Sequence, residues 1–226
     1  MNPASSPNSL SRDLNELRDQ YLRHQLAGDR RAALSFIEAE LGHGVPLRDL
    51  LDHVVQSAQR EIGRLWQEDR ISIAQEHMAT AISQLVVSHL FQHAQFSERI
   101  GRKIVVACVP GELHDFPARM LADSLDVGGY DIRFLGADVP LPDLLRAISE
   151  ERPDVLALSV TMIFNLPSLR TTLAEIRKAH PALPIVVGGH AFDRAADIDA
   201  DPRTRVVQGD SRELVRQLDS LLGVAA

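Results

Sequence analysis

The spacing of apolar residues changes once along this chain, near residue 100. Before that point, apolar side chains recur every three or four residues, which is typical of amphipathic helices. Beyond it, short continuous apolar runs alternate with helical patterns, and such runs are typical of strands buried on both faces of a parallel sheet. The change of period therefore predicts a helical part followed by an α/β part.

The helical part is expected over residues 13–98. A long helix is predicted over 46–66, and a second one starts at Ser72, where Ser72 and Gln75 match the capping-box pattern Ser-x-x-Gln. Two shorter helical segments precede Gly44. Four helices with short connections predict a four-helix bundle, which would form a cap domain.

Residues 102–226 repeat a strand–helix pattern. Alternation at this spacing predicts a flavodoxin-like, doubly wound parallel sheet of five strands, in a Rossmann-like domain with right-handed crossovers. The expected strands are 104–109, 132–135, 155–159, 185–187 and 206–207. The expected helices are about 118–127, 142–151, 166–179 and 211–222.

Composition excludes several functions. Among 226 residues, 24 Lys and Arg stand against 31 Asp and Glu, so the net charge of −7 argues against binding nucleic acids through their phosphates. The single cysteine, Cys108, excludes a disulfide framework or a multi-thiolate metal site within one chain. No run of about 18 apolar residues occurs, so no membrane span is expected. Residues 1–12 are rich in Pro, Ser and Asn without a secretory pattern, which predicts a disordered N-terminus and a cytoplasmic protein.

The loop after the first expected strand carries a carboxylate and a histidine. Ligands of doubly wound sheets bind outside the carboxyl ends of the strands, so this loop lies at the expected crevice. Glu112 precedes His114 by two residues, and a carboxylate so placed can hold one imidazole nitrogen and leave the other for a metal. The alternative is a loop histidine that makes only a local hydrogen bond, and position alone favours that alternative.

The later loops are rich in small and hydroxyl side chains, which let a large ligand approach the backbone closely. The chain has neither a Gly-x-Gly-x-x-Gly nor a Gly-x-x-x-x-Gly-Lys-Ser/Thr pattern, so dinucleotide and nucleoside triphosphate sites lack their phosphate loops. The residues in question are Leu135, Gly136 and Asp138 after the second strand, Ser159 and Thr161 after the third, and Gly188, Gly189 and His190 after the fourth.

These motifs, in this order, resemble a cobalamin-binding domain together with the helical bundle that caps it in corrinoid proteins. The family pattern is Asp-x-His-x-x-Gly after the first strand, Ser-x-Leu or similar after the third, and Gly-Gly after the fourth. In this chain the matching residues are Glu112-x-His114-x-x-Pro117, Ser159-Val160-Thr161 and Gly188-Gly189. Trp66, ten residues before the pair Glu76-His77, looks most like the light-sensing cobalamin-dependent repressors and their relatives. The resemblance covers about residues 20–222.

The resemblance implies a role for each matching loop. His114 would displace the dimethylbenzimidazole of the cofactor and bind cobalt from below, and Glu112 would orient it. The displaced nucleotide tail would lie beside Ser159, Thr161 and the two glycines. The other candidate cofactor contacts in these loops are Leu113, Asp115, Phe116, Leu135, Gly136, Asp138 and His190.

The bundle would shield the upper axial ligand. Ile73, Glu76 and His77 lie at positions i, i+3 and i+4, so they share one helical face. Trp66 ends the preceding helix and is expected against the same ligand. The alternative for Trp66 is a plain core position, and the alternative for His77 is a core histidine with its hydrogen bonds satisfied.

Two residues depart from the family pattern. Pro117 replaces the usual glycine, so the backbone after His114 must take another path. In the light-sensing repressors a histidine commonly follows the tryptophan, and Gln67 stands there in this chain. A photoproduct with two histidine ligands would need another donor, for which His77 is the nearest candidate.

The first functional hypothesis is a cobalamin photoreceptor or sensor. Light would remove the upper ligand, which is expected to be adenosyl. The bundle would then shift and change a homodimer or the contact with a partner regulator. Methylcobalamin and hydroxocobalamin are alternative cofactors, and a noncovalent bilin is a further chromophore to consider. Direct DNA binding is not expected, since the residues before the bundle are too few for a helix-turn-helix.

The second hypothesis is a corrinoid methyl-carrier subunit of a methyltransferase system, which has the same plan of bundle and sheet. A sensor or a carrier is expected rather than an enzyme. The third hypothesis is a flavodoxin-like domain with a regulatory bundle and no cofactor, in which the Glu-x-His pattern is incidental.

Overall fold

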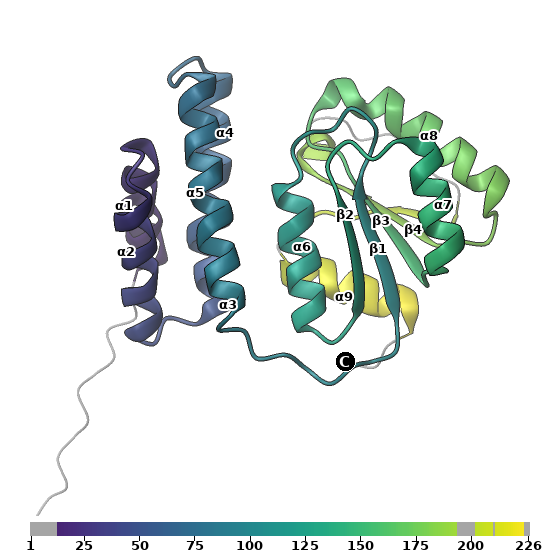
Figure 1. The fold of residues 1–226 in the computed structure, drawn as a ribbon, viewed down its shortest axis with the longest axis horizontal. Coiled ribbons are helices and arrows are strands. Elements are labelled where there is room, and N and C mark those ends of the chain that lie inside the picture. Colours follow the sequence, from purple (N-terminus) through teal and green to yellow (C-terminus); the bar gives the residue numbers. More distant parts are fainter. Residues whose placement is uncertain (1–12, 194–201, 210, 224–226) are drawn as a thin grey trace, which may run out of the picture. The chain divides into compact units, whose positions relative to one another are not determined.

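A computed structural model describes residues 13–193, 202–209 and 211–223 of the chain (Figure 1). The disorder expected for residues 1–12 lies outside the described residues. The described residues form two compact units, of which the first ends at His93 and the second begins at Ala94.

The helices of the first unit follow the predicted order. They are α1 (Leu14–Leu26), α2 (Arg30–Gly42), α3 (Leu47–Asp49), η1 (Leu50–Val55), α4 (Gln56–Gln67) and α5 (Ile73–Phe91). Since α3, η1 and α4 are consecutive, residues 13–93 contain four helical rods, as a four-helix bundle requires. The capping box is confirmed, because the Ser72 hydroxyl accepts from the Gln75 backbone N–H while the Gln75 side chain accepts from the Ser72 N–H.

The helix expected over 46–66 differs from the prediction in its middle. Residues 50–55 form a π-helix rather than an α-helix. In a π-helix, residues five positions apart share a face. Leu50 and Val55 are both fully buried, so the wider turn directs both side chains into the core of the bundle.

Within the described residues, the second unit contains five parallel strands in the order β2-β1-β3-β4-β5. Neighbouring residues of β1 alternate between two cores, with Val105 and Ala107 in one and Ile104 and Val106 in the other. The predicted doubly wound sheet is confirmed. The strands are β1 (Lys103–Cys108), β2 (Asp131–Gly136), β3 (Val155–Ser159), β4 (Ile185–Gly188) and β5 (Thr204–Val206).

Helices cover both faces of this sheet (Figure 1). Apolar residues of α7 and α8 pack in the core on one face, and those of α6 and α9 pack in the core on the other. The bounds are α6 (Phe116–Val127), α7 (Leu141–Glu151), α8 (Leu166–Ala179) and α9 (Ser211–Leu222), with short 3-10 turns η2 (Ile163–Asn165) and η3 (His190–Asp193). None of the helices in the described residues is long and apolar enough to cross a membrane.

The segment before β1 belongs to the second unit, although residues up to 98 were expected in the bundle. The backbone N–H of Ser97 donates to the carbonyl of Val127, and that of Ile100 donates to Gly129. Gly129 has φ of +94°, and a Cβ there would lie 2.2 Å from the carbonyl oxygen of Glu98. The turn after α6 therefore holds this segment through close backbone contacts.

The strand order places one crevice at the centre of the sheet. From β1 the chain moves to β2 on one side and then to β3 on the other, so the direction of winding reverses between β1 and β3. Ligands of doubly wound sheets bind at such a point, outside the carboxyl ends of the strands. The loops that follow β1 and β3 therefore define the candidate site.

Candidate functional site

Glu112, in the loop after β1, is a fully buried carboxylate with five hydrogen bonds. Its Oε1 accepts from the backbone N–H of His114 at 2.9 Å and lies 2.6 Å from Nδ1 of the same residue. Its Oε2 accepts at 2.9 Å from the backbone N–H groups of Thr161 and Met162 and from the side-chain amide of Asn165. A buried charge is costly unless it is paired and hydrogen-bonded, and this carboxylate has both kinds of compensation.

These hydrogen bonds determine the protonation of the pair. Burial by itself raises the pKa of Glu112, but the hydrogen bonds donated by His114, Met162 and Asn165 outweigh it and lower the pKa to about 2. The carboxylate is therefore ionised at neutral pH and can only accept. The Nδ1 of His114 must then carry the proton, so the lone pair of a neutral ring lies on Nε2. This tautomer is the one in which a carboxylate-held histidine binds a metal.

Asp138, in the loop after β2, fixes the backbone around Glu112. Its carboxylate accepts from the backbone N–H of Gly111 at 2.7 Å, and its own N–H donates to the carbonyl of Glu112 at 2.8 Å. Asp138 has φ of +46°, a left-handed conformation that is uncommon outside glycine. This predicted site residue therefore holds the loop that carries Glu112.

Asn165, which the sequence analysis did not single out, connects the loop after β3 to the same carboxylate. It occupies the N-cap position of α8, yet its side chain makes no capping hydrogen bond. Its amide instead donates to Glu112 Oε2 and, at 3.3 Å, to the carbonyl of Gly111. An asparagine just before Leu166-Pro167 matches a helix-start pattern, which places Asn165 at the start of α8 but gives no sign of its contact with Glu112.

Backbone packing requires a glycine at position 189 and leaves little room for a side chain at position 188. Gly189 has φ of +115°, and a Cβ there would lie 2.3 Å from the carbonyl oxygen of Val160. A Cβ at Gly188 would lie 3.1 Å from the carbonyl oxygen of Val207. The next residue, His190, pairs with Asp193 at 2.6 Å rather than with the other candidate site residues.

Thr161 belongs to the Glu112 cluster, which is Glu112 with its hydrogen-bond partners His114, Thr161, Met162 and Asn165. Thr161 contributes its backbone N–H to Glu112, and its hydroxyl lies 3.5 Å from the carbonyl of His114. Ser159 is buried at the end of β3, opposite Cys108 of β1 in the sheet register. Burial raises the pKa of Cys108 to about 12, so this thiol is inert packing, as expected.

Exposed apolar side chains lie at or just beyond the carboxyl ends of β1, β2 and β3. Leu113 and Phe164 are each 70% exposed, and Leu135 and Ile163 are partly exposed. Of these four, only Leu113 and Leu135 are among the residues predicted from the sequence. Phe116, also predicted, is buried at the start of α6 and serves packing, while Asp115 is the N-cap residue of that helix and Gly136 ends β2 with φ of +86°.

The first unit carries the four remaining predicted residues. Glu76 Oε2 lies 2.6 Å from His77 Nδ1, and the Glu76 side chain is only 14% exposed whereas that of His77 is 70% exposed. His77 is therefore not the core histidine of the alternative hypothesis. Trp66 is half-buried at the end of α4, and Ile73 is exposed at the start of α5.

The departure at Pro117 has a local explanation. Pro117 is the second residue of α6, a position where the fixed φ of proline suits a helix start and its missing N–H is not needed. The helix thus begins two residues after His114.

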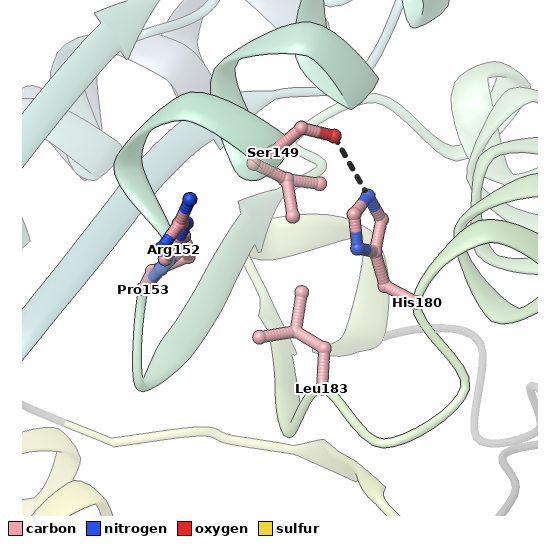
Figure 2. A pocket seen from close by; sticks show the side chains of 6 residues that line it. Ser149, Arg152, Pro153, His180 and Leu183 are labelled. Carbon is pink, nitrogen blue, oxygen red and sulfur yellow. Dashed lines mark hydrogen bonds between the residues drawn. The ribbon is translucent and has the colours of Figure 1, made fainter.

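Two further observations limit where a ligand binds. Across the described residues, no group of three or more His, Cys, Asp or Glu side chains is arranged to hold a metal, so a metal at His114 would need its other ligands from a cofactor. A depression of about 370 Å³ lies where α7 and α8 end, at the opposite edge of the sheet, with Ser149 Oγ 3.3 Å from His180 Nε2 (Figure 2). It shares no residue with the Glu112 cluster.

Known proteins resemble both units. Residues 102–219 match the family model of the B12 binding domain, and residues 17–91 match a second model that carries the same description. Over 175 residues the chain is 29% identical to the HTH-type transcriptional repressor CarH of Myxococcus xanthus. This match spans 77% of this chain but only 58% of the repressor. It is also 28% identical to an uncharacterized 20.5 kDa protein in the bchF-crtJ intergenic region of Rhodobacter capsulatus, over 78% of this chain and 93% of that one.

Among solved structures, the fold resembles the monomethylamine corrinoid protein of Methanosarcina barkeri, with a TM-score of 0.75 and 15% identity over 92% of this chain and all of that one. The family model covers more than half of this chain, and it matches the unit in which Glu112 and His114 meet at the switch point of the sheet. The chain therefore belongs to the B12 binding domain family.

Proposed function

We propose that this chain binds cobalamin through His114 as the lower axial ligand of cobalt and acts as a sensor of the upper axial ligand. The observation that carries the proposal is the buried Glu112 carboxylate, which holds Nδ1 of His114 and leaves the lone pair on Nε2. A lower ligand needs this tautomer and a fixed ring direction. The other four hydrogen bonds to Glu112 fix the carboxylate itself.

The remaining residues of the second unit fit a large cofactor. The exposed Leu113, Phe164, Ile163 and Leu135 would contact the apolar parts of a flat macrocycle, and such exposed apolar clusters are typical of binding sites. Ser159, Thr161, Gly188 and Gly189 would line the path of the nucleotide tail. When bound, cobalamin supplies a cobalt–carbon bond that visible light breaks.

The sensor role is supported by the first unit. The spacing of Trp66, Glu76 and His77 resembles that of the light-sensing repressors, and an HTH-type transcriptional repressor is among the relatives. Trp66 and Glu76 would contact an adenosyl group, and its loss in light would change how the bundle packs. The output would be a change of homodimer or of contact with a partner regulator.

A second candidate function is that of a methyl carrier between partner enzymes. It is favoured by the similarity of fold to the monomethylamine corrinoid protein. In that case the bundle would open for each partner, and the bound form would be methylcobalamin. Illumination would then release the methyl group without changing the state of assembly.

Absorption spectra distinguish these functions. Wild-type protein is reconstituted with adenosylcobalamin in the dark, and its spectrum and size-exclusion elution are recorded before and after green light. The sensor predicts a spectrum typical of cobalamin with a histidine ligand, a spectral change in light and a shifted elution. His114→Ala is the test variant and His180→Ala the matched control, because His180 contacts Ser149 at the far edge of the sheet.

Each outcome has a meaning. Binding with a light-induced spectral change but an unshifted elution would favour the methyl carrier. A His114→Ala variant that retains the spectrum of the wild type would refute His114 as the ligand. Wild-type protein that binds no cobalamin would refute the proposed function itself.

A further inference from the structure

A continuous row of polar side chains runs through the interior of the helical bundle, from Glu76 to Tyr21. Thr80 Oγ1 lies 2.7 Å from Glu76 Oε1, and Gln59 Nε2 lies 2.6 Å from Thr80 Oγ1. Ser83 Oγ lies 3.0 Å from Gln59 Oε1 and 3.3 Å from the Tyr21 hydroxyl. Since Tyr21 and Ser83 are fully buried, this polar row connects α5 with α4 and α1 through the core.

The carboxylate of Glu76 sets the direction of every hydrogen bond in the polar row. A carboxylate only accepts, so Thr80 must donate its single hydroxyl proton to Glu76. The Thr80 oxygen must then accept, which orients the Gln59 amide with Nε2 toward Thr80 and Oε1 toward Ser83. Ser83 therefore donates to Gln59, and Tyr21 donates to Ser83. Burial raises the pKa of Tyr21 above its ordinary value, so the phenol keeps the proton that it donates.

A second glutamine, Gln25, donates to the polar row and leaves its own side-chain oxygen without a hydrogen bond in the described residues. Gln25 is fully buried, and its Nε2 lies 2.9 Å from Ser83 Oγ, 3.2 Å from the carbonyl of Ala79 and 3.4 Å from Gln59 Oε1. Its own Oε1 has no hydrogen-bond partner in the part of the chain that the structure describes. The reversed amide would place that oxygen against three others. Buried polar atoms without partners are rare in native proteins, so the direction of the row is maintained against a penalty.

We propose that the polar row is a positioning device for Glu76, which it holds as a fixed hydrogen-bond acceptor that selects the upper axial group of the cofactor. This inference rests on the proposed function. Thr80 and His77 each take one acceptor position on a different oxygen of the carboxylate, and lone pairs remain on both. Thr80 and Gln59 are thus positioning residues, because they act through Glu76.

The selection follows from what the upper group can donate. The ribose hydroxyls of an adenosyl group can donate to a fixed acceptor, whereas a methyl group offers no donor. A site built to hydrogen-bond a hydroxyl discriminates strongly against a ligand that lacks it, since the polar group of the site is then left unpaired. The polar row therefore favours alkyl cobalamins whose upper group carries hydroxyl donors.

The test is the ratio of dissociation constants for methylcobalamin and adenosylcobalamin, measured by titration in the dark. We expect wild-type protein to prefer adenosylcobalamin, and Thr80→Val and Gln59→Leu to reduce this preference about tenfold, as loss of one hydrogen bond to a charged group predicts. Tyr21→Phe should reduce it less, because the phenol is four hydrogen bonds away. Thr171→Val is the matched control, since that hydroxyl contacts only the carbonyl of Pro167 on α8 among the bonds described for it.

A merely structural role would lower the melting temperature and both affinities together and would leave the ratio unchanged. A second readout needs no cofactor. In apo protein labelled at the glutamate carboxyl carbon, the NMR signal of Glu76 should shift in Thr80→Val and Gln59→Leu and stay in place in Thr171→Val.

The outcomes separate this inference from the proposed function. Wild-type protein that binds both cobalamins equally well, or variants that keep the wild-type ratio, would overturn the role of the polar row and leave cobalamin binding intact. Wild-type protein that binds no cobalamin would overturn both. An NMR signal of Glu76 that keeps its chemical shift in Thr80→Val would show that the polar row does not hold the carboxylate.

Discussion

The side-chain amide of Asn165 lies 2.9 Å from the carboxylate of Glu112, which precedes it by 53 positions. This contact joins the loops that follow β1 and β3, the two strands between which the winding of the sheet reverses. The carboxylate in turn holds Nδ1 of His114 at 2.6 Å. The direction of the histidine therefore depends on a residue of a distant loop.

Removal of this contact should weaken both folding and ligand binding. In Asn165→Ala the buried Glu112 loses one of its hydrogen bonds, which costs about 1–3 kcal/mol of unfolding free energy. Cobalamin affinity should fall as well, because the ring of His114 is less firmly oriented. Urea unfolding of apo protein and titration with cobalamin measure the two effects.

Ser168→Ala is the control for this variant. The Ser168 hydroxyl donates to the carbonyl of Pro110 at 2.7 Å, so it connects α8 with the same loop without contacting Glu112. It should cost some stability and leave cobalamin affinity unchanged. Equal losses of affinity in the two variants would mean that cobalamin binding depends on the position of the loop after β1 rather than on the hydrogen bond to Glu112.

Stability at low pH should report the charge of Glu112. Its pKa is lowered in the folded protein from the ordinary 4.5 to about 2, so the ionised form stabilises the fold above pH 4.5 and this contribution disappears as the pH falls through 2. The shift corresponds to about 3 kcal/mol. Glu112→Gln cannot titrate, so the stability advantage of the wild type over this variant should shrink by about that amount between pH 5 and pH 2.

Other carboxylates titrate in both proteins and cancel in this difference, which urea unfolding at a series of pH values measures on apo protein. A difference that stays constant with pH would show that the hydrogen bonds to Glu112 do not depend on its charge.

The left-handed backbone at Asp138 predicts that two substitutions there lower the unfolding free energy by different amounts. Asn tolerates this conformation and retains a side-chain oxygen for the N–H of Gly111. Asp138→Asn should therefore lower the unfolding free energy by less than about 1 kcal/mol. Asp138→Ala loses the acceptor and is strained at φ of +46°, and it should cost about 2 kcal/mol. Thermal unfolding compares them, and an alanine variant as stable as the asparagine variant would contradict this role.

Alanine substitutions at Gly136 and Gly189 distinguish the cost of a steric clash from the cost of backbone strain alone. At Gly189, alanine would place a Cβ 2.3 Å from the carbonyl oxygen of Val160, in addition to the strain of φ of +115°. At Gly136, φ is +86° but no atom lies within 4 Å of the added Cβ. Gly136→Ala should therefore cost about 1 kcal/mol and Gly189→Ala at least about 3 kcal/mol, as chemical denaturation would measure. Similar costs at both positions would mean that the loop at Gly189 moves aside.

The sequence predicted the elements that depend on periodicity. The bundle and the parallel sheet follow from apolar spacing, and the start of α5 follows from Ser72 and Gln75, because all of these are local patterns. The π-helix at residues 50–55 has no such pattern, since it arises from packing of the wider turn into the core. The last strand begins at Thr204 rather than at Val206, since its ladder with β4 starts before the apolar pair.

The candidate site was predictable where side chains form its contacts. Glu112 and His114 stand two positions apart, and their contact follows from that spacing. Thr161 and Met162 contribute backbone N–H groups, for which any residue would serve, so their side chains give no signal. The polar row was missed because Tyr21 and Gln59 lie far apart in the sequence and meet only in the folded bundle.

The most direct test of the central claim is the electron paramagnetic resonance spectrum of the protein bound to cobalt(II) cobalamin. Superhyperfine splitting reports the nitrogen that binds cobalt from below. Protein labelled with nitrogen-15 histidine should change this splitting from a triplet to a doublet, and His114→Ala should abolish the change. A triplet that persists in the labelled protein would show that the cofactor keeps its own dimethylbenzimidazole, and His114 would not be the ligand.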